Sequence, residues 1–147
     1  MRATNDATAE GLVARVAEAY ERGDFGPLLE SLDENVVWIS ASANRAAFRF
    51  AGIYRGRAGV LEVTSQIAVT LTFLKYRPRE IICQGETVWS LVDCEIVPLG
   101  AKRPVAFEMA TRFRIRGGRI LEYRGFVDTE YLKATMPSVA DAAQTAA

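Results

Sequence analysis

The fold is decided near the end of the chain by Val105-Ala-Phe-Glu-Met-Ala-Thr-Arg-Phe-Arg-Ile-Arg-Gly-Gly-Arg-Ile-Leu-Glu-Tyr-Arg-Gly-Phe-Val-Asp128. From Phe107 to Arg116 apolar and polar side chains alternate, and a period of two is typical of a strand with one buried face. Gly117 and Gly118 then supply the two positive φ angles that a two-residue hairpin turn needs. The stretch therefore predicts two long antiparallel strands joined by a tight turn.

A two-residue turn also fixes which residues of the two strands lie opposite one another. In this register Ile115 faces Ile120, Thr111 faces Arg124, and Phe107 faces Asp128. Opposite residues share a face of the sheet. The face expected to hold the functional site carries Phe107, Met109, Thr111, Phe113, Ile120, Glu122, Arg124, Phe126 and Asp128.

The bulk composition is that of an ordinary globular protein. The chain has 147 residues, enough for one domain with a sizeable core, and 50% of them are apolar. Basic and acidic residues balance to a net charge of zero, so the composition does not indicate nucleic acid or an anionic membrane as a partner. No apolar run reaches membrane-spanning length and no signal-peptide pattern opens the chain, so we expect a cytoplasmic protein.

The sequence contains no histidine. This removes the usual general base, the usual zinc ligand and every Ser-His or Cys-His mechanism. Cys83 and Cys94 lack metal or redox spacing, and no glycine-rich phosphate loop follows a strand. We therefore expect neither a metal nor a cofactor.

Three helices precede the long strands in the expected order of elements. Apolar spacing predicts helices over residues 6–22, from Asp24 through Leu32, and over residues 58–70. Strands are expected over residues 35–40, 75–83 and 87–97, with a flap or irregular hairpin over residues 41–53 and a short helix after Asp128. The result is an α+β fold, in which three N-terminal helices pack on the concave face of a curved, cone-shaped antiparallel sheet.

Four short motifs in this order carry a family resemblance. They are Gly23-Asp24-Phe25, Val36-Val37-Trp38, Tyr54-Arg-Gly56 and the stretch from Gly118 to Asp128. Together they resemble the SnoaL-like, ketosteroid isomerase-like branch of the nuclear transport factor 2-like superfamily over about residues 8–133. The resemblance implies a single domain over residues 1–136, with an alanine-rich tail over residues 137–147. It leaves the reaction open, because the superfamily includes isomerases, cyclases, epoxide hydrolases, dehydratases and proteins without activity.

The catalytic positions of the ketosteroid isomerase members are not kept. Those members use a tyrosine in the first helix, an aspartate base after the first strand and a protonated aspartic acid on a later strand. The matching places in this chain fall on Val16, on Ile39 or Ser40, and on Met109. Apart from the weak hydroxyl of Ser40, none of these side chains exchanges a proton, so isomerase chemistry of that kind is not expected.

Asp128 remains as the catalytic candidate. Epoxide hydrolase members are similar in ending the last strand with aspartate, but their arginine and second aspartate fall on Val92 and Cys94. Polyketide cyclase members are similar in placing an acid near Asp128, but their partner histidine is missing. Two roles stay open for Asp128: a helix cap, or a general acid–base whose pKa is raised by Phe107 and Phe126.

We expect a small, mostly apolar molecule in the cone. Its expected ligand-binding residues are Trp38, Tyr54, Ser90, Phe107, Met109, Thr111, Arg124 and Phe126. The leading hypothesis is a cofactor-independent isomerase, cyclase or dehydratase that uses Asp128. The alternatives are a ligand-binding domain without turnover and a dimerisation domain with a filled interior. For single residues, the structural alternatives are that Trp38 and Tyr54 are core aromatics and that Arg124 belongs to an internal ion pair.

The opposite sheet face has the composition of an interface. It is expected to carry Trp89, Leu91, Arg112, Leu121 and Tyr123, and aromatic residues and arginine are enriched at protein interfaces. We therefore expect a homodimer through this convex face. The alternative is a solvated face on which Arg112 stacks against Trp89.

Overall fold

The computed structural model describes residues 2–47 and 49–135, and these form an α+β fold. The helices are α1 (Arg2–Glu21), α2 (Gly26–Glu30), α3 (Gly56–Thr70) and α4 (Thr129–Thr135). The strands are β1 (Leu32–Ser40), β2 (Gly52–Arg55), β3 (Leu71–Gln84), β4 (Thr87–Pro98), β5 (Val105–Arg116) and β6 (Arg119–Val127). The expected tail over residues 137–147 lies outside the described residues.

The six strands form one mixed sheet in the order β2-β1-β6-β5-β4-β3. Strands β1 and β6 run parallel and the other neighbours antiparallel, so the expectation of a wholly antiparallel sheet is wrong at this pair. Both strands begin at the same end of the sheet. There the N–H of Ile120 donates to the carbonyl of Ser31 at 2.8 Å, and the guanidinium of Arg119 donates to the carbonyl of Glu30 at 2.7 Å.

The segment expected to form a flap or an irregular hairpin ends in a short strand, whose bounds the sequence pattern did not predict. Gly52–Arg55 forms β2, which pairs antiparallel with β1 from Val37 to Ser40. Four residues give too few alternations for a period of two to be recognised in the sequence. The added strand forms the edge of the sheet beside β1 and leads directly into α3.

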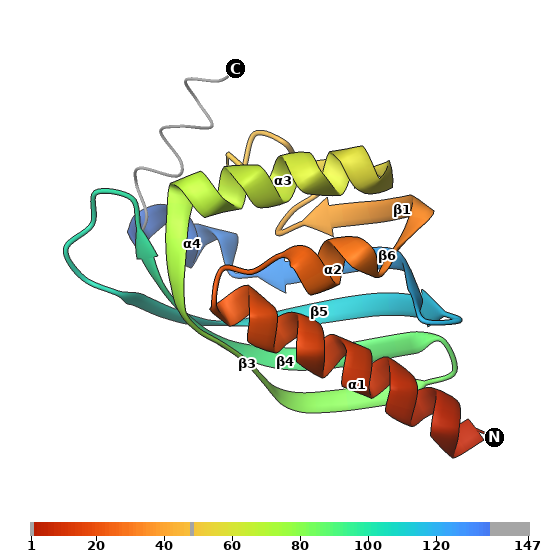
Figure 1. Ribbon diagram of the computed structural model, residues 1–147. Helices are drawn as coiled ribbons and strands as arrows, with labels where there is room; N and C mark the ends of the chain where they lie inside the picture. The colour runs from red at the N-terminus through yellow and green to blue at the C-terminus, as the bar shows by residue number, and fades with distance from the viewer. Residues whose placement is uncertain (1, 48, 136–147) are drawn as a thin grey trace.

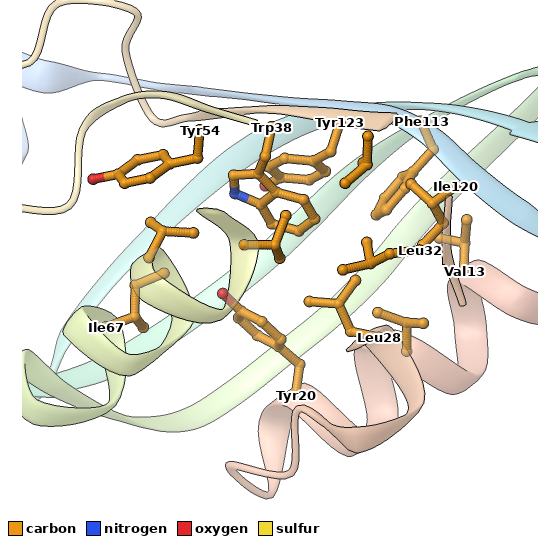
Figure 2. Packing of buried hydrophobic residues seen from close by; sticks show 14 of the residues in the cluster. Val13, Tyr20, Leu28, Leu32, Trp38, Tyr54, Ile67, Phe113, Ile120 and Tyr123 are labelled. Carbon is orange, nitrogen blue, oxygen red and sulfur yellow. The ribbon is translucent and has the colours of Figure 1, made fainter. Parts of the chain in front are cut away.

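The helices α1, α2 and α3 lie on the same face of the sheet, as expected (Figure 1). We call this the covered face and the opposite one the open face. Strand β4 shows the division, because its buried residues on the covered face alternate with residues that are less buried. Those buried side chains are Val88, Ser90, Val92, Cys94 and Ile96. Figure 2 shows how core residues from α1, α2, α3 and the sheet meet in this layer.

The hairpin turn forms as the sequence predicts. Gly117 and Gly118 have φ angles of 57° and 75°, values that side chains other than glycine rarely adopt. Ile115 lies opposite Ile120, so the first pair of the expected register is confirmed.

Beyond that pair a bulge changes the register. Leu121 is an extra residue in β6, so that Arg114 lies opposite Glu122. One inserted residue reverses the facing of every residue that follows it. The residues of β6 that therefore face the covered side are Tyr123, Gly125 and Val127, whereas those that face the open side are Glu122, Arg124 and Phe126. The expected facing of this half of β6 is wrong.

Candidate ligand-binding site

A cavity lies between the helices and the covered face, and we call it the main cavity. Its space for the centres of water molecules is about 60 Å³. Its aromatic lining residues are Tyr20, Trp38, Phe50, Phe73, Tyr76, Phe107 and Tyr123; the others are Ser40, Ala41, Ile67, Leu71, Ile96, Met109, Val127 and Leu132. No carboxylate, amine or guanidinium occurs among these described lining residues. The main cavity is thus apolar, with hydroxyl and indole groups as its polar side chains.

A smaller hollow adjoins the main cavity. It has about 20 Å³ for the centres of water molecules, and the hydroxyls of Ser90 and Thr111, which lie 2.6 Å apart, belong to its lining residues. Four aromatic residues line both spaces and so form the wall between them. This aromatic wall consists of Tyr20, Trp38, Tyr76 and Tyr123.

Stacking holds the aromatic wall in place. The rings of Trp38 and Tyr123 are 3.8 Å apart between centroids and inclined by 21°, and the parallel pairing of β1 with β6 puts the two residues side by side (Figure 2). The rings of Tyr20 and Tyr76 are 4.8 Å apart. Gly125 gives Tyr123 its room, because a Cβ at position 125 would lie 2.8 Å from the Tyr123 hydroxyl oxygen. The wall is therefore a packed unit rather than a set of loose side chains.

The phenols of the wall are held in their neutral form. Burial raises the pKa of Tyr20, Tyr76 and Tyr123 above the ordinary value for tyrosine. The side chains of Tyr76 and Tyr123 are also hydrogen-bonded to each other. At cellular pH these residues are consequently uncharged, and they offer O–H groups that donate hydrogen bonds.

Trp38 adds a donor whose hydrogen bond is not made. Its Nε1–H is buried and has no hydrogen-bond partner among residues 2–47 and 49–135. In Figure 2 the nitrogen-bearing edge of the indole is turned toward the side of Tyr54 and away from Phe113. A buried donor without a partner costs about 1–3 kcal/mol. Among the residues that line the main cavity, Trp38 therefore carries the polar group with the most to gain from an acceptor.

Five of the expected ligand-binding residues lie at these two spaces. Trp38, Phe107 and Met109 line the main cavity, and Ser90 and Thr111 line the smaller hollow. Alternation in β4 and β5 was enough to place four of them, and the β-branched and aromatic content of β1 placed Trp38.

Three other expected residues lie elsewhere. Tyr54 is buried, donates from its hydroxyl to the carbonyl of Ala51 at 3.2 Å, and is not among the lining residues of the main cavity. Arg124 and Phe126 lie on the open face because of the bulge at Leu121, and the Arg124 guanidinium lies 4.8 Å from the centre of the Phe126 ring. The prediction that these two share a face with Phe107 is wrong.

Asp128 precedes α4 and caps it. Its Oδ1 accepts a hydrogen bond of 3.0 Å from the backbone N–H of Tyr131, which confirms the capping role. The carboxylate is exposed, and Asp128 is not among the residues that line the main cavity. Its expected position opposite Phe107 is wrong, since Val127 already lies opposite Met109.

The lining residues that the sequence did not assign to the site include the three tyrosines of the aromatic wall. Tyr20 lies within the first expected helix, over residues 6–22, where its helical spacing with other apolar residues marks a core position and no more. Tyr76 follows a register shift between Phe73 and Lys75, and Tyr123 follows the bulge at Leu121. In both strands the irregularity interrupts the alternation that would have identified the residue.

The open face carries exposed apolar side chains in its middle. Ile82, Trp89 and Phe126 are exposed by 65%, 42% and 39%, and the rings of Trp89 and Phe126 stack 6.0 Å apart. Ile82 lies opposite Trp89 on the neighbouring strand. We call these three residues the open-face patch. Tyr123, which was expected on this face, is buried on the other side.

Ion pairs surround the open-face patch. Glu122 lies 3.3 Å from Arg112 and 3.5 Å from Arg114, and Glu86 pairs with Arg116. These pairs are partly exposed, so each contributes little to stability. They cover much of the face with charge but leave the patch itself apolar.

The described part of the chain offers neither of two further classes of site. No group of three or more histidine, cysteine, aspartate or glutamate side chains there could hold a metal ion. No helix of that part is long and apolar enough to cross a membrane.

The protein is of the α+β class in which helices cover one face of a mixed sheet above an apolar cavity. The family model of the SnoaL-like domain matches residues 13–123, and the chain belongs to that family. No curated protein matches it.

Solved structures share the fold. A nuclear transport factor 2-like protein of Burkholderia pseudomallei has 19% identity and a TM-score of 0.77, with 86% of this chain and 95% of that chain covered. TerC, crystallised with polyporic acid, has 17% identity and a TM-score of 0.74, with 86% and 96% covered. An LEH-like epoxide hydrolase of M. tuberculosis has 15% identity and a TM-score of 0.72, with 97% and 99% covered.

Proposed function

We propose that this protein binds a small, mostly apolar molecule in the main cavity. The observation that carries the proposal is a hollow lined by aromatic and aliphatic side chains inside an otherwise close-packed core. Protein interiors are packed as densely as organic crystals, and an empty apolar space lowers stability. A hollow retained at the centre of the fold is therefore best explained by an occupant.

The size of the main cavity indicates the size of that occupant. A space of about 60 Å³ for water centres corresponds to roughly four to six water molecules, or about 120–180 Å³ of liquid volume. This suits a molecule of one or two rings, such as indane. Typical ligand pockets hold about 300 Å³ or more, so a larger ligand would have to displace lining side chains.

The fold relatives support a small-molecule role. One of them was crystallised with polyporic acid and another is an epoxide hydrolase. The hypothesis of a cofactor-independent isomerase, cyclase or dehydratase therefore stays within the chemistry of this fold.

Acid–base catalysis by Asp128 would require its carboxylate to reach the ligand. Because Asp128 is exposed and caps α4, we infer binding as the function and assign no turnover to Asp128.

Calorimetric titration with indane tests the binding proposal. We expect saturable binding of one molecule per chain. Val127→Phe places a larger side chain in the lining and should abolish the heat of binding. Val69→Phe is the matched control, since Val69 is 57% exposed on α3 and does not line the main cavity. A wild type that binds neither indane nor its ketone, 1-indanone, would contradict the proposal.

We also propose that a second copy of the chain covers the open-face patch. Three large apolar side chains are exposed together there, and such patches mark association sites. The expected dimer face is kept, but its aromatic residues are Trp89 and Phe126 rather than Trp89 and Tyr123.

Light scattering after gel filtration tests the dimer. Trp89→Glu should yield a monomer, whereas Leu61→Glu, an exposed leucine on α3, should leave a dimer. A wild type that is already monomeric at micromolar concentration would contradict this second proposal.

A further inference from the structure

The polar groups of the main cavity limit the chemistry of its occupant. Among the described lining residues, the side-chain groups that can hydrogen-bond are the hydroxyls of Ser40, Tyr20, Tyr76 and Tyr123 and the indole of Trp38. All of them can donate a hydrogen bond, and none of them is charged at cellular pH. The side chains of Tyr76 and Tyr123 already bond to each other, whereas Nε1–H of Trp38 has no partner in the described chain.

A charged occupant would not be stabilised in this surrounding. An anion would meet no guanidinium or ammonium, and a cation would meet no carboxylate, among the described lining residues. Moving an unpaired charge from water into an apolar space carries a large desolvation cost. An occupant without any polar atom would fit, but it would leave the indole N–H of Trp38 unsatisfied.

We propose that the main cavity selects a neutral molecule with an accepting oxygen, of the ketone, ester or quinone class, and that Nε1–H of Trp38 donates to that oxygen. This inference rests on the proposed binding function and adds the chemical class of the ligand. Trp38 is suited to the task because its ring is fixed by stacking on Tyr123 at 3.8 Å. A fixed ring keeps the N–H direction constant, so little orientational freedom is lost on binding. Since Nε1 is itself buried, neighbouring lining atoms must shift slightly to admit the oxygen.

Three probes with one ring skeleton test the inference: indane, 1-indanone and indane-1-carboxylate. We expect 1-indanone to bind about tenfold more tightly than indane, which is the factor that a hydrogen bond of about 1.4 kcal/mol gives. The carboxylate should not bind. Trp38→Phe should remove the preference for 1-indanone while indane still binds, because phenylalanine keeps an aromatic ring but has no donor.

A spectroscopic measurement on the wild type makes the test independent of how the variant folds. The indole ¹H–¹⁵N resonance of Trp38, distinguished from that of Trp89 with a Trp89→Phe variant, should shift downfield on saturation with 1-indanone. With indane it should move much less. A resonance that stays in place with bound 1-indanone would overturn the inference.

The possible failures are distinguishable. Equal affinities for indane and 1-indanone, or preferential binding of the carboxylate, would overturn the assignment of Trp38 and leave the binding function intact. Absence of binding by both neutral probes would instead reject the proposed function together with the inference that rests on it.

Discussion

Replacing Tyr123 by phenylalanine removes one hydroxyl from the aromatic wall and keeps the ring that stacks on Trp38. At neutral pH the variant should lose a moderate amount of stability. The partner hydroxyl of Tyr76, a partly buried residue of the core cluster, would lose its hydrogen bond, and a buried polar group left unsatisfied costs about 1–3 kcal/mol. The stacking contact at 3.8 Å needs only the ring. The free energy of unfolding should therefore fall by about 1–3 kcal/mol.

The same variant should change how stability responds to alkaline pH. Burial raises the pKa of Tyr123 in the folded protein, whereas in the unfolded chain a tyrosine loses its proton near pH 10. Above about pH 10 the unfolded chain thus binds fewer protons than the folded one, and stability falls as pH rises toward the folded pKa. One such group contributes about 1.4 kcal/mol per pH unit to the decline. Tyr123→Phe should make the decline shallower by that amount above about pH 10 and leave it unchanged below about pH 9.

Urea unfolding followed by far-ultraviolet circular dichroism, at a series of pH values from about 8 to about 11, measures both effects. The matched control is Phe113→Leu, because Phe113 packs edge-on against Tyr123 at 5.0 Å and carries no ionisable group. The control should lower stability without altering its pH dependence. If Tyr123→Phe and the wild type lose stability in parallel above about pH 10, the inference that Tyr123 is a buried, neutral phenol is refuted.

Three further predictions concern the last strand and its helix. Asp128→Ala should cost about 1 kcal/mol and Asp128→Asn only a few tenths, measured by urea unfolding; a neutral alanine variant would contradict the cap. Gly125→Ala should cost about 1–3 kcal/mol through overpacking against the Tyr123 hydroxyl and should weaken 1-indanone binding, and unchanged values of both would refute the close approach. Deletion of Leu121 should abolish cooperative unfolding, because Tyr123 would then turn to the open face; a native-like amide spectrum would contradict this reading of the bulge.

The turn of the hairpin could be predicted because its information is local. Two consecutive glycines at a strand end define the turn, and the turn defines the first opposite pair, Ile115 with Ile120. The bulge at Leu121 could not be predicted in this way, since neither Leu121 nor its neighbour Glu122 is a residue type that marks a bulge. Local pattern therefore predicted the elements well and the facing of the second half of β6 wrongly.

Non-local pairing was the other limit of the sequence. The parallel contact of β1 with β6 joins strands from opposite ends of the sheet-forming part of the chain. No periodicity within either strand specifies which neighbour it takes. Without knowledge of that pairing, neither the stack of Trp38 on Tyr123 nor the aromatic wall that contains it can be predicted. The resemblance to a known family implied the architecture but could not indicate these side chains, because the family's own catalytic positions are occupied differently.

The bulge explains why the two faces of the sheet differ in chemistry. In an unbroken register Glu122, Arg124 and Asp128 would face the helices, and the cavity would contain charges that could bind an ionised ligand or transfer a proton. The extra residue moves Glu122 and Arg124 to the open face, where Glu122 pairs with arginines and Arg124 lies over Phe126. It brings Tyr123 inward in their place. A single inserted residue thus leaves the cavity without charged side chains and lines it with hydrogen-bond donors. At the same time it adds the exposed ring of Phe126 to the surface proposed to bind the second copy.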